Sequence, residues 1–288
     1  MYQFCVFTPT YNRAYTLERL FKSLKRQTYQ NFEWVVLDDG STDGTNGMVS
    51  RFIADGSIPI TYLRTENRGK TRAVNQGIEL CRDELFICVD SDDWLDDRAL
   101  QVFHEKWEGV KCDSSIAGMI ALHGNPDGSP VGGRMPRGVA RTNAWDLYNK
   151  YHFKGDAIHV YRSEIFRSYP APVADGEKFL SEGYAIHEIA KKYDVALIDE
   201  VLHLGEYLPD GYTNNVRKLT KDNPKGYMLV KKQSIEMSQS ILQKGYNTIL
   251  YEVGCLLAGE SPIAGAPSKA LAVVCLPFAF LLRCTVYH

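Results

Sequence analysis

The stretch Leu85-Phe86-Ile87-Cys88-Val89-Asp90-Ser91-Asp92-Asp93 joins an apolar run directly to a run of carboxylates. The apolar part indicates a buried β-strand, and the polar part marks the point where the strand ends. Carboxylates this close together repel one another and raise one another's pKa. A hard divalent cation removes that cost, and Mg²⁺ and Mn²⁺ prefer carboxylate and phosphate oxygens. The run therefore predicts a metal site, with a solvated turn that caps the next helix as the alternative.

Strands and helices alternate through the first part of the chain. The apolar patterns predict strands at 4–7, 32–37, 60–63 and 85–89, and helices at 16–25, 42–53, 71–81 and 96–107. Units of strand, helix and strand build a parallel sheet with helices on its faces. Ligands of such sheets bind at the carboxyl ends of the strands. We therefore expect Thr8–Asn12, Asp38–Ser41 and Asp90–Asp93 to converge on one crevice.

The second half of the chain is less regular. Further strands are predicted at 116–122, 156–161 and 195–198, and a helix at 181–192. The Gly/Pro-rich segment Gly124–Gly138 is long for a loop, which is typical of functional or mobile segments. From Pro224 onward the pattern is helical, with an amphipathic segment at Met228–Leu242 and an apolar one at Thr248–Leu257. The sequence thus predicts an α/β domain of residues 1–215 and a helical extension of residues 216–288.

Composition and charge are those of an ordinary globular protein. The 288 residues are 44% apolar and 24% charged, with a formal net charge of -2. This balance creates no field that would recruit nucleic acid. The seven cysteines form no Cys-x-x-Cys pair, and none is spaced with a histidine as zinc ligands are. We interpret them as reduced structural thiols, which favours the cytoplasm as the compartment.

Both ends of the chain bear on its relation to a membrane. Met1 leads almost directly into the first strand, so no signal peptide is expected. The apolar run Ala270–Leu282, interrupted by Pro277, is too short to span a bilayer. It is either a buried helix or a segment lying in a membrane interface, at the inner face of the cell membrane. We therefore expect the helical extension to be membrane-peripheral or to form a homo-oligomer.

Three further groups of residues carry chemistry. Asp38-Asp39-Gly40-Ser41 ends the second strand, where a carboxylate can accept a hydrogen bond from a base edge, with a plain turn as the alternative. The segment Asn67–Gly77 opens a helix with glycine and cations, which suits a diphosphate, or else it is a solvated basic helix face. Tyr11 follows the first strand, where its ring would stack on a nucleobase or line the rim.

These pieces, in this order, resemble the large family-2 inverting glycosyltransferases of the GT-A fold, of the kind that assembles bacterial polysaccharides. The resemblance covers the chain up to Asp93. Its motifs stand here as Thr8-Pro9-Thr10-Tyr11-Asn12, Asp38-Asp39-Gly40-Ser41-Thr42-Asp43-Gly44-Thr45, Asn67-Arg68-Gly69 and Asp90-Ser91-Asp92-Asp93. The resemblance implies a GT-A fold, that is, a Rossmann-like and mostly parallel central sheet flanked by helices.

The resemblance also implies a donor site. Thr8, Pro9, Tyr11 and Asp39 would hold the base, usually uracil, and Asp90 would contact the ribose or help to place the metal.

A metal and cations would hold the phosphates of that donor. Asp92 would ligate the Mn²⁺ or Mg²⁺ that bridges the diphosphate, and His203 could add a metal contact. Many members have Ala-Arg-Asn where this chain has Ala73-Val74-Asn75, so Lys70 or Arg72 would face the phosphates instead. The remaining implied donor contacts are Asn67, Gly69 and Ser91.

Inverting transfer needs a carboxylate that takes the proton of the acceptor hydroxyl. The family usually supplies it from a Glu-Asp pair that opens a helix in the second half of the chain. Phe179-Leu180-Ser181-Glu182-Gly183-Tyr184 matches that segment, with Gly183 in place of the Asp. Glu182 is therefore the candidate base and Glu177 the reserve, while the alternative for Glu182 is a favourable charge in the first turn of a helix.

The sequence thus predicts transfer of a sugar from a nucleotide-sugar donor, a UDP-sugar, to a hydroxyl of a glycan or lipid-linked acceptor. The alternative is a non-catalytic sugar-nucleotide-binding subunit of a membrane-associated polysaccharide assembly complex. A nicotinamide-dependent enzyme is disfavoured because no Gly-x-Gly-x-x-Gly follows the first strand. A response-regulator receiver is disfavoured because the acidic pair follows the second strand and not the first.

Overall fold

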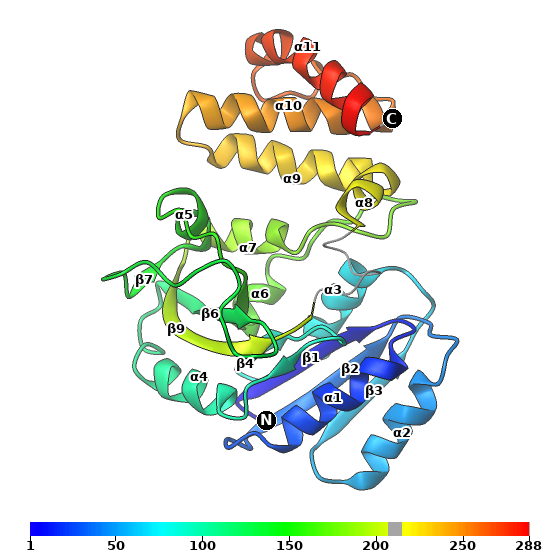
Figure 1. The fold of residues 1–288 in the computed structure, drawn as a ribbon, viewed down its shortest axis with the longest axis vertical. Coiled ribbons are helices and arrows are strands. Elements are labelled where there is room, and N and C mark those ends of the chain that lie inside the picture. The colour runs from blue at the N-terminus through cyan, green and yellow to red at the C-terminus, as the bar shows by residue number, and fades with distance from the viewer. Residues whose placement is uncertain (207–214, 288) are drawn as a thin grey trace. The chain divides into compact units, whose positions relative to one another are not determined.

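The computed structural model describes residues 1–206 and 215–287. The chain divides into two compact units (Figure 1). The first comprises Met1–Pro170 and Ala185–Glu206, and the second comprises Ala171–Tyr184 and the described part of Tyr207–His288. The chain therefore passes into the second unit twice. A boundary between residues 215 and 216 stays a prediction.

One mixed sheet forms the centre of the first unit. Its strands are β1 (Phe4–Thr10), β2 (Phe32–Asp38), β3 (Ile60–Arg64), β4 (Leu85–Cys88), β5 (Trp94–Leu95), β6 (Ile116–Gly124), β7 (Arg141–Thr142), β8 (Ala157–Arg162) and β9 (Asp194–Leu204). The order is β3-β2-β1-β4-β8-β6-β9-β5, with β7 paired to β9. Strands β1 to β4 are parallel, as predicted. Strand β8 runs antiparallel to both β4 and β6, so the sheet is mixed beyond β4.

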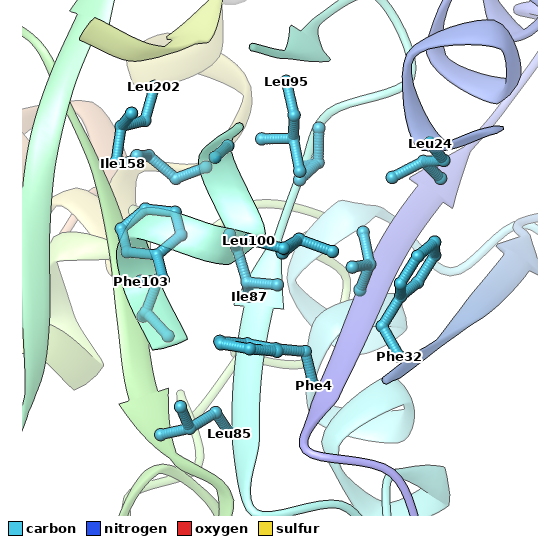
Figure 2. Close-up of a cluster of buried hydrophobic side chains, with 14 of the residues drawn as sticks. Phe4, Leu24, Phe32, Leu85, Ile87, Leu95, Leu100, Phe103, Ile158 and Leu202 are labelled. Carbon is cyan, nitrogen blue, oxygen red and sulfur yellow. The ribbon is translucent and has the colours of Figure 1, made fainter. Parts of the chain in front are cut away.

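Successive residues of β1 point to opposite faces of the sheet, and helices pack against both faces. The helices of this part of the chain are α1 (Ala14–Lys25), α2 (Thr45–Asp55), α3 (Lys70–Leu80), α4 (Ala99–Glu108), α5 (Ala144–Asn149), α6 (Ser163–Arg167) and α7 (Gly183–Ala190). Phe4 and Val6 belong to the larger core cluster, shared with α1 and α4 (Figure 2). Cys5 and Phe7 belong to the cluster on the α3 side.

Close packing fixes the position of α3, the helix predicted to begin the anion site. A Cβ atom at Gly77 would lie 2.1 Å from the ring of Phe7 on β1. Only glycine lets the helix approach the strand this closely, because any side chain would collide with that ring. The start of α3 at Lys70 is thereby held at the end of the sheet where β1 terminates.

The second unit is helical. It contains α8 (Val216–Asp222), α9 (Pro224–Met237), α10 (Ile241–Ala258) and α11 (Lys269–Val286). The prediction of one continuous segment over Met228–Leu242 is wrong, because α9 ends at Met237 and α10 begins at Ile241. Serines cause the break: the Ser238 hydroxyl donates back to the Ser234 carbonyl, and the Ser240 side chain accepts the Gln243 N–H as an N-cap.

Candidate functional site

The carboxyl ends of β1, β2 and β4 lie next to one another, as the alternating pattern predicted. Thr10, the last residue of β1, is paired with Asp38, the last of β2. One residue further on, the Asp39 N–H donates to the Thr10 carbonyl at 2.8 Å. On the other side of β1, the Val89 N–H donates to the Phe7 carbonyl at 2.9 Å. The polar segments after these three strands therefore share one edge of the sheet.

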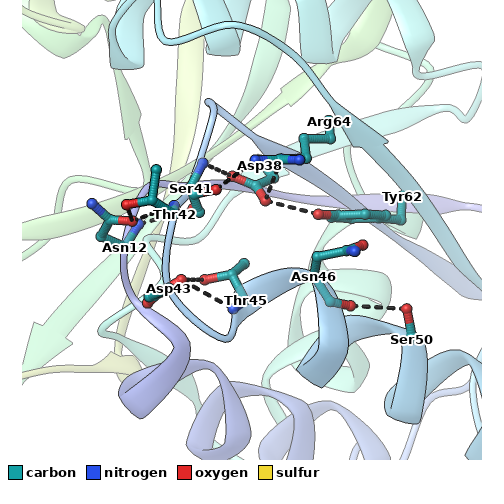
Figure 3. A network of polar contacts seen from close by, with 10 residues as sticks. All are labelled: Asn12, Asp38, Ser41, Thr42, Asp43, Thr45, Asn46, Ser50, Tyr62 and Arg64. Atoms are coloured by element: carbon teal, nitrogen blue, oxygen red, sulfur yellow. Dashed lines mark hydrogen bonds and ion pairs between the residues drawn. The ribbon is translucent and has the colours of Figure 1, made fainter.

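The loops after β1 and β2 are tied together by side chains (Figure 3). The Asn12 side-chain oxygen accepts the Thr42 N–H at 2.8 Å, and the Asn12 N–H donates to the Ser41 hydroxyl at 2.9 Å. Asn12 has φ 53°, a left-handed conformation that asparagine tolerates better than most residues. Asp43 accepts the Thr45 hydroxyl and the N–H groups of Ala14 and Thr45, and these bonds lower its pKa although burial opposes them.

Asp38 holds the loop after β2 through Ser41. Its carboxylate is fully buried and accepts the Ser41 N–H and the Tyr62 hydroxyl, both at 2.7 Å. Arg64 lies 3.8 Å from the same carboxylate and donates to the Ser41 carbonyl. Burial and the Asp38 charge raise the pKa of Tyr62, so its hydroxyl stays protonated and keeps donating.

Asp39 was predicted to contact the base, and the structure gives it a partner of its own. Its two oxygens accept the backbone N–H groups of Arg68 and Gly69, each at 2.8 Å. Gly40, at φ 83°, lies so close to this loop that a Cβ would sit 2.8 Å from the Asn67 nitrogen. Asp39 therefore holds the Asn67–Gly69 loop in place at the start of α3, whichever base contact it makes.

The acidic run after β4 brings three carboxylates together. Asp90, Asp92 and Asp93 each offer an oxygen, and these oxygens lie within 4.8 Å of one another. The Lys70 ammonium group on α3 is 2.7 Å from Asp90. Burial and the negative charge of Asp93 raise the pKa of Asp92. Carboxylate oxygens this close, one of them costly to ionise, are the donors that a hard divalent cation relieves, so these residues fit Mn²⁺ or Mg²⁺.

Two histidines, His203 and His123, adjoin the acidic run at Asp93. His203 on β9 is buried, and its Nε2 is 3.2 Å from an Asp93 oxygen. Its Nδ1 is 2.6 Å from the Nδ1 of His123 on β6, which the β6–β9 ladder places opposite. Although burial opposes it, the Asp93 charge raises the pKa of His203, while His203 lowers that of Asp93. His203 thus has Asp93 as its partner, and its role as a metal ligand stays a prediction.

Sequence reasoning missed Arg19, which supports the acidic run from α1. Its guanidinium donates to the Asp92 carbonyl at 2.6 Å and lies 4.0 Å from the centre of the Trp94 ring. It also pairs with Glu206 at 3.3 Å. The only signal was a cation on the partly exposed side of a predicted helix, which is indistinguishable from an ordinary solvated residue until the tertiary contacts are known.

The other predicted donor residues lie at or below this edge. Thr8 and Pro9 are buried within β1, and the Thr8 hydroxyl accepts the Trp34 indole N–H at 2.9 Å. Tyr11 is exposed at the end of the strand, with nearly half of its surface accessible. Ser91 is buried within the acidic run. Arg72 donates to the Arg68 carbonyl in its own helix at 3.2 Å.

The two candidate bases belong to the second unit. Both oxygens of Glu177 accept backbone N–H groups, from Lys225 at 2.7 Å and Gly226 at 2.8 Å, in the first turn of α9. Those N–H groups have no partner within the helix, and a carboxylate is favoured there by the helix dipole. Glu182 is half-buried and immediately precedes α7. Glu177 therefore caps the start of α9.

Comparison with known proteins agrees with this geometry. Residues 5–169 match the family model described as glycosyl transferase family 2. Glycosyltransferase GlyA of Streptococcus pneumoniae is 32% identical over 118 residues, which is 41% of this chain and 17% of that protein. The poly(ribitol-phosphate) beta-N-acetylglucosaminyltransferase TarS of Staphylococcus aureus is 32% identical over 103 residues, 35% of this chain and 18% of that protein. The chain thus matches less than a fifth of the length of either relative.

Solved structures share the fold. S. aureus TarS 1–349 in complex with UDP-GlcNAc has a TM-score of 0.65 at 17% identity, covering 87% of this chain and 70% of that one. A mannosyltransferase from Pyrobaculum calidifontis in complex with GDP-Man and Mn²⁺ has a TM-score of 0.58 at 19% identity, covering 99% and 82%.

Because the family model matches more than half of its length, the chain belongs to glycosyl transferase family 2. The family and the α/β fold predicted from the sequence are confirmed.

Proposed function

We propose that this glycosyltransferase uses a UDP-sugar as donor and transfers the sugar to a hydroxyl of a glycan or lipid-linked acceptor, with Mn²⁺ or Mg²⁺ held by Asp90 and Asp92. The convergence of the three carboxylates of the acidic run with Lys70 at one strand edge carries this proposal. A metal bound there would supply positive charge against the diphosphate as it leaves.

The residues around the acidic run have complementary tasks in this proposal. The exposed ring of Tyr11 stacks on the base, at the end of β1. Lys70 exchanges its bond with Asp90 for a phosphate oxygen when the donor enters. Arg19 fixes the backbone of Asp92 and so keeps the run in one conformation before the donor arrives. The complexes of the two structural neighbours support a nucleotide-sugar donor of this kind.

Glu182 takes the proton of the acceptor hydroxyl in this proposal. The resemblance of Phe179–Tyr184 to the family's Glu-Asp segment supports it. The two N–H groups of α9 that Glu177 accepts argue against Glu177 as this base.

Donor and metal binding are tested by thermal unfolding with UDP and Mn²⁺. A ligand at a hundred times its Kd stabilises the folded state by about 2.7 kcal/mol, so wild type should melt at a higher temperature with both present. Asp92→Ala should remove most of that shift. Asp97→Ala is the matched control, because Asp97 pairs with Arg26 in an exposed ion pair outside the acidic run. Equal shifts for Asp92→Ala and wild type would overturn the metal assignment.

Transfer is tested separately from binding. Glu182→Gln should keep the UDP and Mn²⁺ shift but lower transfer from a UDP-sugar by about a hundredfold or more. Glu177→Gln should instead lower the melting temperature, because it disturbs the start of α9. Retained turnover in Glu182→Gln would move the base elsewhere. If wild type bound UDP with metal but transferred sugar to no acceptor pool, the non-catalytic binding subunit would become the better reading.

A further inference from the structure

Helix α11 has two faces of different kinds. Small side chains, Ala272, Cys275 and Ala279, are buried and recur at helical spacing on one side. The Cys275 thiol lies against the Gly245 carbonyl of α10, at 3.7 Å. Small residues let two helices approach closely, and α11 packs on α10 along this side (Figure 1). The inward face of α11 is therefore satisfied within the second unit.

The opposite face of α11 is large, apolar and exposed. Val274, Phe278 and Leu281 recur at spacings of four and three, Val273 adjoins Val274, and each of the four has more than half of its surface accessible. Pro277 lies among them and is exposed as well. A water-facing helix normally places polar residues on this side. An exposed apolar stripe of this kind marks a surface that binds another protein or a membrane.

Length and packing decide how α11 can meet a bilayer. Among the described residues, α11 is the one helix whose length and composition would allow it to cross a membrane, with a mean hydropathy of 1.8 and 17% burial. This helix, Lys269–Val286, is longer than the apolar run Ala270–Leu282, so the predicted limit on length applies to that run and not to the whole helix. Eighteen residues span about 27 Å, slightly less than the hydrocarbon core. Crossing would also require α11 to leave α10, which covers its small-residue face. Lying in the membrane plane keeps that contact and covers only the exposed face.

The charges of this part of the chain favour an anionic surface. Helix α11 contains no carboxylate, and its two cations, Lys269 and Arg283, are about four turns apart and so fall on the same side, at the border of the apolar face. Over residues 216–288 taken together, lysines and arginines outnumber carboxylates, and most of the excess lies in residues 217–232: Arg217, Lys218, Lys221, Lys225, Lys231, Lys232, Lys244, Lys269 and Arg283 against Asp222, Glu236, Glu252 and Glu260. This excess of positive charge complements an anionic surface.

We propose that the exposed face of α11 binds the surface of a lipid bilayer that contains anionic headgroups. Val273, Val274, Phe278 and Leu281 enter the boundary between headgroups and acyl chains, while Lys269 and Arg283 contact lipid phosphates. The contact needs neither donor nor metal. Its failure in an experiment is therefore distinct from a failure of the proposed transferase function.

Insertion is read out with a polarity-sensitive dye on a cysteine. Cys284 and Cys112 are both exposed, and Cys284 lies on the exposed side of α11 whereas Cys112 lies in the first unit. The dye on Cys284, in a Cys112→Ser background, should shift to the blue with vesicles of phosphatidylcholine and phosphatidylglycerol. The dye on Cys112, in a Cys284→Ser background, should not. No shift at Cys284, or equal shifts at both positions, would overturn the proposal.

Vesicle flotation separates the apolar and charged contributions. Phe278→Gln combined with Leu281→Gln should weaken binding at least about tenfold, because it removes two apolar side chains from the interface. Ile53→Gln is the matched control, since Ile53 is an exposed apolar residue of α2. Lys269→Gln combined with Arg283→Gln should lower binding to phosphatidylglycerol vesicles about tenfold and leave binding to pure phosphatidylcholine unchanged.

A second copy of the chain is the competing occupant. Sedimentation equilibrium without lipid should give a monomer for wild type. A stable dimer that the Phe278→Gln and Leu281→Gln pair dissociates would mean that α11 is covered by another protomer, and would overturn the lipid proposal.

Discussion

Each unit buries one carboxylate completely, and the two differ in whether hydrogen-bond donors surround them. Asp38, in the first unit, accepts the Ser41 N–H and the Tyr62 hydroxyl and faces Arg64. Glu252, on α10 of the second unit, is just as buried, but neither of its oxygens has a hydrogen-bond partner in the described part of the chain. Burial alone raises the pKa of Glu252 to about 7.

The difference follows from the kind of backbone that surrounds each group. A strand that ends in a turn exposes N–H groups, so a carboxylate at a strand end finds donors close by. A residue in the middle of a helix finds none, because every neighbouring N–H already donates within the helix. Buried carboxylates are thus supported where strands or helices end, as at Asp38 and Glu177, and unsupported in the middle of α10, at Glu252.

The largest loss of stability is expected when Asp38 itself is removed. Asp38→Ala leaves the Ser41 N–H and the Tyr62 hydroxyl without an acceptor and Arg64 without a counter-charge. It should lower the free energy of unfolding by about 3–4 kcal/mol. Chemical denaturation measures this. Asp38→Asn, which keeps the shape and one acceptor oxygen but removes the charge, should lose clearly less; equal losses would mean that the negative charge, and not shape or the remaining hydrogen bond, holds this edge.

Removing the Glu252 carboxylate should stabilise the protein, whereas removing that of Asp38 destabilises it. The pKa of Glu252 is raised from 4.5 to about 7. This carboxyl group therefore costs no folding stability below about pH 4.5, and its cost grows as the pH rises through 7. At pH 8 the charge costs about 3 kcal/mol. Glu252→Met should therefore stabilise the protein at pH 8 and less at pH 5. Melting temperatures at the two pH values measure the difference, and a variant equally stabilised at both would exclude the charge as the cause.

The smallest effect is expected at the turn next to Asp39. A methyl group at Gly40 would lie 2.8 Å from the Asn67 nitrogen, at a φ that side chains avoid. Gly40→Ala should lower the free energy of unfolding by about 1–2 kcal/mol and weaken UDP binding, because it displaces the loop that Asp39 holds. Gly56→Ala is the control, since Gly56 also has a positive φ but open space around it. UDP affinity unchanged in Gly40→Ala would separate this loop from the donor site.

Local pattern predicted well which polar segments meet at the edge of the sheet. Strand ends are visible in a sequence, because an apolar run stops where polar residues begin, as at Val89 and Asp90. The parallel order of the first strands then brings those ends together without further information. The partners of the carboxylates were not visible. Asp39 with the Asn67–Gly69 loop and His203 with His123 are pairs from distant segments.

By itself, the sequence determined the family, the parallel half of the sheet and the residues of the acidic run, since each depends on neighbours along the chain. Only the tertiary structure decided that the sheet is mixed beyond β4, that Arg19 supports Asp92, and that Glu177 caps α9. It also decided which face of α11 is exposed. These features join residues far apart in the chain, and a hydrophobic pattern records whether a side chain is buried but not which partner buries it.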